Sequence, residues 1–271
     1  MNNVFSPKRF GQYFLYDLNN AKNNFGLSLL ILGLLPVIFF IVAELFSLLF
    51  NGAFNMNAEA SIPGRATTTM IAVLVAVLAG PVKLYGSVTD KRSGSSFLML
   101  PASSFEKWLS MVLMTVVVLP LCFGVVYFGA DTIMGLIFPD SFGTPIVKVP
   151  SEYVNTASFG DYDVHFSFWG VLYANWCMYT LFFTLGAIVF KKAKIGKSIL
   201  VLFGLGVLFS IVLTILVGHA ADADLEAFLS GLNVDPEVAI KIFINFCKVV
   251  MGLEIAALLA LLYARLRTIK Q

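Results

Sequence analysis

The sequence contains few of the residues from which enzyme active sites are built. It has two histidines and three cysteines, and only 13% of its residues are charged. A soluble globular domain has about 25% charged residues, so this composition excludes that class. No His-Glu-x-x-His run is present to bind zinc, and no Gly-x-Ser-x-Gly run is present to supply a nucleophilic serine. We therefore expect no metal site, no bound cofactor and no catalytic site in this chain.

Nucleotide and nucleic-acid binding are also disfavoured. Gly196-Lys197-Ser198 resembles the end of a phosphate-binding loop, but Lys191 occupies the position of its first glycine. The net charge is only +2, and no basic stripe alternates with solvent-facing aromatic residues. If ATP drives this protein, a separate subunit must hydrolyse it.

Long apolar stretches fill most of the chain, in which 59% of the residues are hydrophobic. About 20 apolar residues are needed to cross a hydrocarbon layer of about 30 Å. The sequence predicts an all-helical, polytopic membrane protein with six transmembrane helices, at about residues 26–50, 68–86, 108–137, 166–190, 198–218 and 242–264.

Lysine and arginine avoid every second gap between these stretches. Of the 18 basic residues, 13 lie in four segments: 1–25, 87–107, 191–197 and 265–271. Positive residues are retained in the cytoplasm. The pattern predicts a multi-pass protein of the inner (cytoplasmic) membrane with both termini in the cytoplasm.

Residues 1–25 form an N-terminal segment ahead of the first span. Phe10, Tyr13 and Phe14 recur at helical spacing, with polar residues around them. This pattern predicts an amphipathic helix in the membrane interface. It serves either as an aromatic anchor for the first span or as an elbow helix that contacts a cytoplasmic partner.

The loop at residues 87–107 joins the second and third spans. A Ser-Gly-Ser-Ser break is followed by the apolar run 97–100 and by Pro101, and Ser103 or Ser104 can then cap a new helix. An apolar patch in a loop needs a cover. The sequence leaves open whether this one lies against the bilayer or the protein's own spans, or in a groove on a partner.

Phe97-Leu98-Met99-Leu100-Pro101-Ala102-Ser103, followed by Glu106-Lys107, resembles the "LPAS…EK" signature in the first cytoplasmic loop of ABC type-2 permeases. These are the membrane subunits of ATP-binding-cassette exporters, and the version common in Bacteroidetes-type bacteria is the most similar. The start, Lys8-Arg9-Phe10-Gly11, is similar to the opening of the same proteins.

The resemblance implies a permease subunit that forms the substrate path and couples to a cytoplasmic ABC ATPase, which binds ATP and magnesium. It also implies a second permease copy, as a homodimer or a related heterodimer. The ATPase would dock on a coupling helix in the loop after the second span, with the elbow helix beside it. The implied docking residues are Lys91, Arg92, Phe97, Leu98, Leu100, Pro101, Glu106 and Lys107. The alternative hypothesis is a membrane scaffold or assembly factor that needs no ATPase.

Among the rare ionisable residues inside the predicted spans are Glu44, Lys83, Lys248 and Glu254. A charge in hydrocarbon costs about 2.5–3.5 kcal/mol, so each such residue needs a partner, water or a changed protonation state. Lys83 lies near the end of its span and can extend to the interface. Glu44 and Lys248 have matched depths, so an interhelical pair is plausible. We expect Glu254 to face a cavity or a subunit interface.

Prolines predict where helices bend or begin. Pro36, Pro81 and Pro120 lie inside the first three spans and tend to kink them. Asp235-Pro236-Glu237 predicts the start of the sixth helix. Residues 138–165 predict an irregular or short-strand loop.

Overall fold

The computed structural model describes residues 5–52, 58–90, 94–148, 156–159, 162–165, 167–222 and 236–269. Nearly all of them are helical, which confirms the predicted helical class. The long helices are α1 (Pro7–Gly33), α2 (Leu35–Asn51), α3 (Ala58–Tyr85), α6 (Leu119–Ile137), α9 (Phe168–Val189), α10 (Lys194–Asp222) and α12 (Pro236–Thr268). The short elements are η1 (Gly86–Thr89), α4 (Gly94–Met99), α5 (Ser104–Leu113), the π-helical stretch η2 (Met114–Val118) and α7 (Pro139–Phe142).

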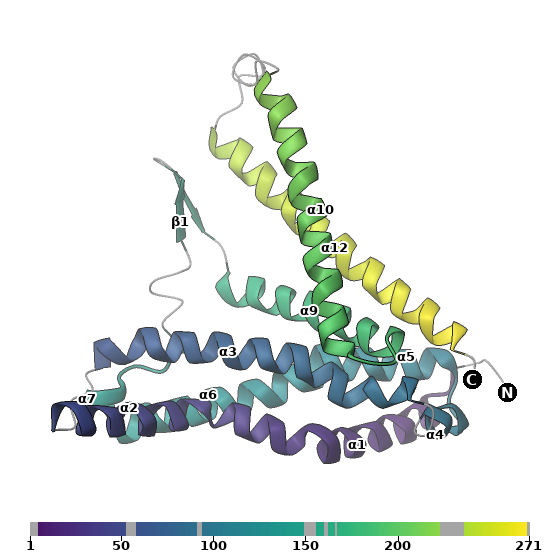
Figure 1. The fold of residues 1–271 in the computed structure, drawn as a ribbon, viewed down its shortest axis with the longest axis horizontal. Helices are drawn as coiled ribbons and strands as arrows, with labels where there is room; N and C mark the ends of the chain where they lie inside the picture. The colour runs from purple at the N-terminus through teal and green to yellow at the C-terminus, as the bar shows by residue number, and fades with distance from the viewer. Residues whose placement is uncertain are drawn as a thin grey trace.

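The described residues of each predicted span are mostly helical. Among the described residues, five helices are long and apolar enough to cross a membrane, and a bent pair, α1 with α2, makes a sixth if it is one span. Several apolar helices of this kind indicate a multi-pass membrane protein. The start of α1 and the end of α12 lie at the same end of the molecule, which we call the terminal end (Figure 1).

The first helix breaks at Leu34 and not at residue 25. α1 continues from the N-terminal segment to Gly33 without interruption, and α2 then leaves at an angle of 42°. Pro36 lies in the first turn of α2, where its missing N–H costs least. The predicted kink at this proline is therefore confirmed. The predicted boundary between the elbow segment and the first span is not a break in the backbone.

The third span is one long helix made of α5, η2 and α6. It begins at Ser103, whose side chain accepts a hydrogen bond from the backbone N–H of Glu106 while the Glu106 carboxylate accepts one from the backbone of Ser103. This reciprocal capping fixes the start of α5. The π-helical stretch ends just before Pro120, which cannot donate a backbone hydrogen bond.

The core lies where α3 passes between α1, α6 and α9. Small side chains on α3, Ala72 and Ala76, are fully covered and let the neighbouring helices approach. Gly33 allows another close approach, because a Cβ atom there would lie 2.3 Å from Cγ1 of Val126 on α6. This contact fixes the place where α1 ends against α6.

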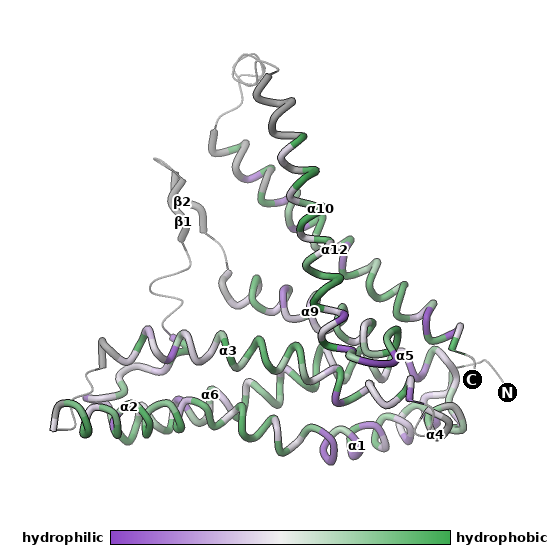
Figure 2. Tube along the Cα trace, viewed as in Figure 1, coloured by the Kyte–Doolittle hydropathy of each residue, from purple (hydrophilic) through white to green (hydrophobic). Residues whose placement is uncertain are grey.

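α10 and α12 stand away from the other helices over most of their length (Figure 1). α12 packs on α9 and α5 near the terminal end, and α10 packs on α9. Only 6% of the candidate span in each is buried, against 50% in α3 and α9. Figure 2 shows that the described residues along these two helices are largely hydrophobic.

A two-stranded antiparallel hairpin lies in the predicted loop at 138–165. β1 (Thr156–Phe159) pairs with β2 (Tyr162–His165), with Thr156 opposite His165 and Phe159 opposite Tyr162. The short-strand alternative for this loop is therefore the one that the structure shows. α12 begins at Pro236, as predicted.

Candidate functional site

Glu106 joins the loop before the third span to the N-terminal helix. Arg9 donates from Nε to Oε2 and from Nη2 to Oε1, both at 2.8 Å, and the backbone N–H of Ser6 donates to Oε1 at 3.0 Å. The carboxylate also accepts the capping bond from the backbone of Ser103 at 2.7 Å. Glu106 is 0% exposed. The forked Arg9–Glu106 pair therefore clamps α1 to α5 with a fixed geometry.

Lys107 holds α4 against α5 from the other side. Its Nζ donates to the carbonyl oxygen of Phe97 at 2.7 Å and lies 4.8 Å from the centroid of the Phe97 ring. The Lys107 side chain is buried, and Phe97 packs against the core of the bundle. The loop is thus a folded platform rather than a flexible linker.

Aromatic rings extend this contact to the C-terminal helix. Phe105 packs against Phe5 on one side and against Trp108 and Tyr263 on the other, with ring centroids 5.5–6.4 Å apart. Trp108 also donates from Nε1 to the carbonyl oxygen of Leu259 at 3.1 Å. α5 therefore connects the first and last helices at the terminal end.

The predicted elbow aromatics belong to the same assembly. Phe10 stacks between Phe5 and Phe14, with ring centroids 5.8 and 5.9 Å apart. Tyr13 is buried. At least part of the aromatic face of α1 therefore packs against protein, a contact that hydropathy alone does not reveal.

Asp17 is a buried carboxylate that the sequence reading did not single out as a site. Its Oδ2 accepts hydrogen bonds from Tyr85 Oη at 2.8 Å and from Ser110 Oγ at 2.6 Å. These contacts join α1, α3 and α5. The available signal was its helical spacing, which places Asp17 one turn after Tyr13 on a face that is otherwise aromatic.

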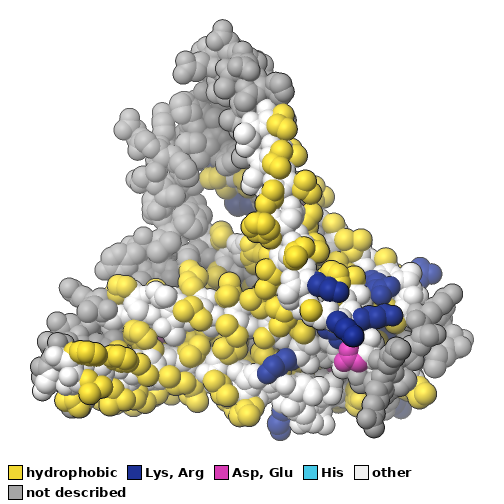
Figure 3. All heavy atoms as spheres, viewed as in Figure 1, with side chains coloured by type: hydrophobic (Ala, Val, Ile, Leu, Met, Phe, Trp, Pro, Cys, Tyr) yellow, Lys and Arg dark blue, Asp and Glu magenta, His cyan; other side chains and the backbone are white. Residues whose placement is uncertain are grey.

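A lysine fastens the second span to the connection between α9 and α10. Lys194 donates from Nζ to the carbonyl oxygen of Gly86 and, at 2.9 Å, to Asp90 Oδ1. Lys191, Lys192 and Lys197 lie beside it in the sequence. Figure 3 shows basic side chains gathered on this part of the surface, near the start of α10.

The structure sorts the predicted docking residues into two groups. Glu106, Lys107 and part of Phe97 are turned into the protein, because they make the contacts that fold the loop. Pro101 is exposed and Leu100 is half-buried. Lys91 and Arg92 lie outside the described residues, and so does the side chain of Leu98. Among the described apolar side chains of the loop, Met99 is the most exposed, at 78%.

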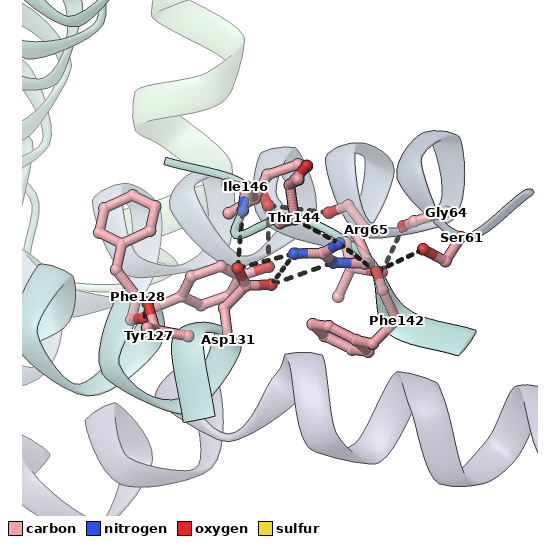
Figure 4. A network of polar contacts seen from close by, with 12 residues as sticks. Ser61, Gly64, Arg65, Tyr127, Phe128, Asp131, Phe142, Thr144 and Ile146 are labelled. Carbon is pink, nitrogen blue, oxygen red and sulfur yellow. Dashed lines mark hydrogen bonds and ion pairs between the residues drawn. The ribbon is translucent and has the colours of Figure 1, made fainter. Parts of the chain in front are cut away.

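A second buried polar network lies at the opposite end, between α3 and α6 (Figure 4). Arg65 Nη2 lies 2.7 Å from both carboxylate oxygens of Asp131, and Nε lies 3.1 Å from Oδ1. Arg65 Nη1 donates to the carbonyl oxygens of Phe142 and Thr144 at 2.7 and 3.0 Å. Both charged side chains are 1% exposed.

The rest of this network anchors the segment that follows α6. The backbone N–H of Ile146 donates to Asp131 Oδ2 at 2.8 Å, and Ser61 Oγ donates to the carbonyl oxygen of Phe142 at 2.9 Å. The Phe142 ring also lies under the Arg65 guanidinium, 3.9 Å from Cζ. The predicted topology places Arg65 in a gap between spans, and the intramembrane charges predicted from the sequence do not include Asp131 of the third span. In the structure α3 begins at Ala58, before the apolar stretch at 68–86, so Arg65 lies within a helix.

The expected intramembrane pair between Glu44 and Lys248 does not form. Glu44 lies on α2, which packs on α3 and α6, whereas Lys248 lies exposed on α12, which packs on α9 and α5. Matched depth does not make two helices neighbours, and this prediction was wrong for that reason. Oε2 of Glu44 is buried without a hydrogen-bond partner among the described residues. Glu254 is exposed on α12.

No protein-family model, curated protein or solved structure matches this chain. Its function must therefore be argued from the residues and their geometry.

Proposed function

We propose that this protein is the permease subunit of an ATP-dependent ABC exporter, and that its cytoplasmic ATPase docks on the loop between the second and third spans. The observation that carries the proposal is the clamp between Arg9 and Glu106. It joins the predicted elbow helix to the loop whose sequence resembles the coupling segment of ABC type-2 permeases. A partner that pushes on this loop would move α1 and α5 together.

The construction of the loop suits the transmission of force. Lys107 holds α4, the Ser103 capping box fixes the start of α5, and Trp108 ties α5 to α12. A flexible loop would absorb the movement of a docked subunit, whereas a platform tied to three long helices passes it to the spans. Of the 18 basic residues, 13 lie in the four sequence segments that contain both termini and the two predicted cytoplasmic loops, which supports a cytoplasmic location for the terminal end.

The uncovered helices α10 and α12 support a second permease copy as the other partner. Lys248 and Glu254 are exposed within the apolar span of α12, and neither has a described partner. Lipid tails cannot solvate these charges, at a cost of about 2.5–3.5 kcal/mol each. A subunit interface or a water-filled substrate path along α12 would remove this cost, while membrane lipids cover the remaining apolar surface.

The test is copurification of the ATPase from membranes with the tagged chain. We expect an ABC ATPase in amounts similar to the permease, and we expect Met99→Asp to abolish its recovery. Met99→Leu is the matched control and should retain the ATPase, because it keeps an apolar side chain at the exposed position. Phe97→Asp is a poorer test, because Phe97 packs on the core and its substitution reports on folding instead.

Two results would contradict the proposal. Recovery of the chain in stable complexes that never contain an ATPase favours the alternative hypothesis of an ATPase-independent scaffold. Normal ATPase recovery with Met99→Asp moves the contact away from this loop, most simply to the elbow helix. Glu106→Gln distinguishes docking of the ATPase from coupling through the Arg9–Glu106 clamp. Because this substitution weakens the clamp but leaves the exposed surface of the loop, the ATPase should still bind while its hydrolysis is less well coupled to transport.

A further inference from the structure

A polar pocket of about 270 Å³ opens at the terminal end between α1, η1 and α4. Phe97 and Leu100 of the proposed docking loop form one wall. Most of the polar lining comes from α1, namely Tyr13, Tyr16, Asp17, Asn20 and Asn24, and the rest is Tyr85 at the end of α3 and Ser87 of η1. The pocket is therefore part of the surface that a partner docked on the loop would cover.

A buried carboxylate lies in the wall of this pocket. Asp17 is 6% exposed, and its two hydrogen bonds, from Tyr85 and Ser110, both go to Oδ2. Among the described residues, no donor reaches Oδ1 and no basic side chain lies within ion-pair distance of Asp17. A buried carboxylate without a cation is unfavourable. A positively charged donor at the free oxygen would remove this cost.

The chemistry around Asp17 narrows the choice of donor. The hydroxyl of Tyr13, one helical turn away, accepts no described hydrogen bond, so the pocket holds two acceptors about one turn apart. The exposed ring of Tyr16 and the half-buried ring of Phe97 offer aromatic surface beside them. A planar guanidinium donates several hydrogen bonds at fixed angles and stacks on aromatic rings. Anions are excluded by the carboxylate.

We infer that this pocket receives an arginine side chain of the cytoplasmic partner, with its guanidinium donating to Asp17 Oδ1 and Tyr13 Oη. The inference rests on the proposed function for the identity of the partner, but not for the chemistry of the pocket. An arginine in this pocket would make the docking contact specific. The exposed apolar side chain of Met99 supplies binding area, and the buried Asp17 carboxylate recognises one basic residue of the partner.

The pocket can be tested on the purified chain alone, with methylguanidinium as the probe and methylurea as its neutral match. The reporter is Asn24→Cys, a substitution at an exposed residue of the pocket lining, in a background in which Cys122, Cys177 and Cys247 are replaced. For a contact of this size we expect millimolar binding, so about 20 mM methylguanidinium should slow alkylation of the new thiol about fivefold. Methylurea should have no effect.

Asp17→Asn is the decisive variant. Its side-chain oxygen can still accept from Tyr85 and Ser110, so the contacts between helices are retained while the charge is lost. We expect the protection by methylguanidinium to disappear in this variant. Tyr13→Phe, which removes only the hydroxyl, should reduce it about threefold, as expected for the loss of one hydrogen bond.

The outcomes separate the pocket from the proposed function. Equal protection in the wild type and in Asp17→Asn, or equal protection by methylurea, overturns the guanidinium site. Protection that appears only after Arg92→Gln shows that the chain's own arginine fills the pocket, and this also overturns the inference. If the probe binds as expected and Asp17→Asn also loses a copurifying ATPase, the pocket is part of the docking contact. If the probe binds but no ATPase is ever recovered, the proposed function fails and the guanidinium site remains.

Discussion

Removal of one partner from the buried pair of Arg65 and Asp131 should be among the most damaging single changes in this protein. Asp131→Ala leaves the Arg65 guanidinium in a site where it is 1% exposed, with only two carbonyl oxygens as acceptors. Breaking a buried ion pair from one side costs about 3–5 kcal/mol. The backbone N–H of Ile146 also loses its acceptor, which adds about 1 kcal/mol or more.

A double-mutant cycle identifies the pair as the cause. Arg65→Ala should cost a similar amount, because it leaves the Asp131 carboxylate buried with the Ile146 amide as its remaining described donor. The double substitution should cost clearly less than the sum of the two, since it removes the unpaired charge that each single change leaves behind. The assay is reversible unfolding of the purified chain in mixed micelles, followed by tryptophan fluorescence.

Asp90→Ala is the matched control for the loss of an acidic partner. Asp90 also pairs with a basic residue, Lys194, but its side chain is 51% exposed. An exposed pair contributes about 1 kcal/mol or less. The reasoning is refuted if Asp131→Ala costs no more than Asp90→Ala, or if the costs of the two alanine substitutions at the buried pair simply add.

Two other predictions concern topology and packing. Single cysteines at residues 95 and 160, in a background without native thiols, should be labelled from opposite sides of the membrane, and labelling of residue 95 from outside would reverse the whole orientation. Gly33→Ala should destabilise the protein by about 1–3 kcal/mol, because the new Cβ would lie 2.3 Å from a methyl group of Val126. Gly129→Ala, which meets no atom within 4 Å, should be close to neutral in the same unfolding assay, and equal effects at the two glycines would remove the close helix contact as the cause.

The sequence by itself determined the features that depend on neighbouring residues. Long apolar runs predicted the helices because every backbone polar group in hydrocarbon must be paired within its own segment. Pro36 predicted the break between α1 and α2, and Ser103 or Ser104 predicted the start of α5, where the structure shows Ser103 as the cap; both signals act within one helical turn. These signals are local, so the rest of the fold does not alter them.

The distribution of lysine and arginine between the spans is also a local signal. It predicts which end of each helix faces the cytoplasm, but it contains no information on which helices touch. The proposed pairing of Glu44 with Lys248 failed for this reason, because a matched distance along two helices does not make those helices neighbours.

Only the tertiary structure decided which polar groups meet. Arg65 finds Asp131 across 66 positions of sequence, Arg9 finds Glu106 across 97, and Asp17 is enclosed by donors from two other helices. Each contact depends on the rotation of a helix about its own axis and on the identity of its neighbour. Apolar residues surround most of these helices, so hydropathy barely constrains that rotation. Close packing, as at Gly33, selects one arrangement, and the buried charges then fix it because only their partners can satisfy them.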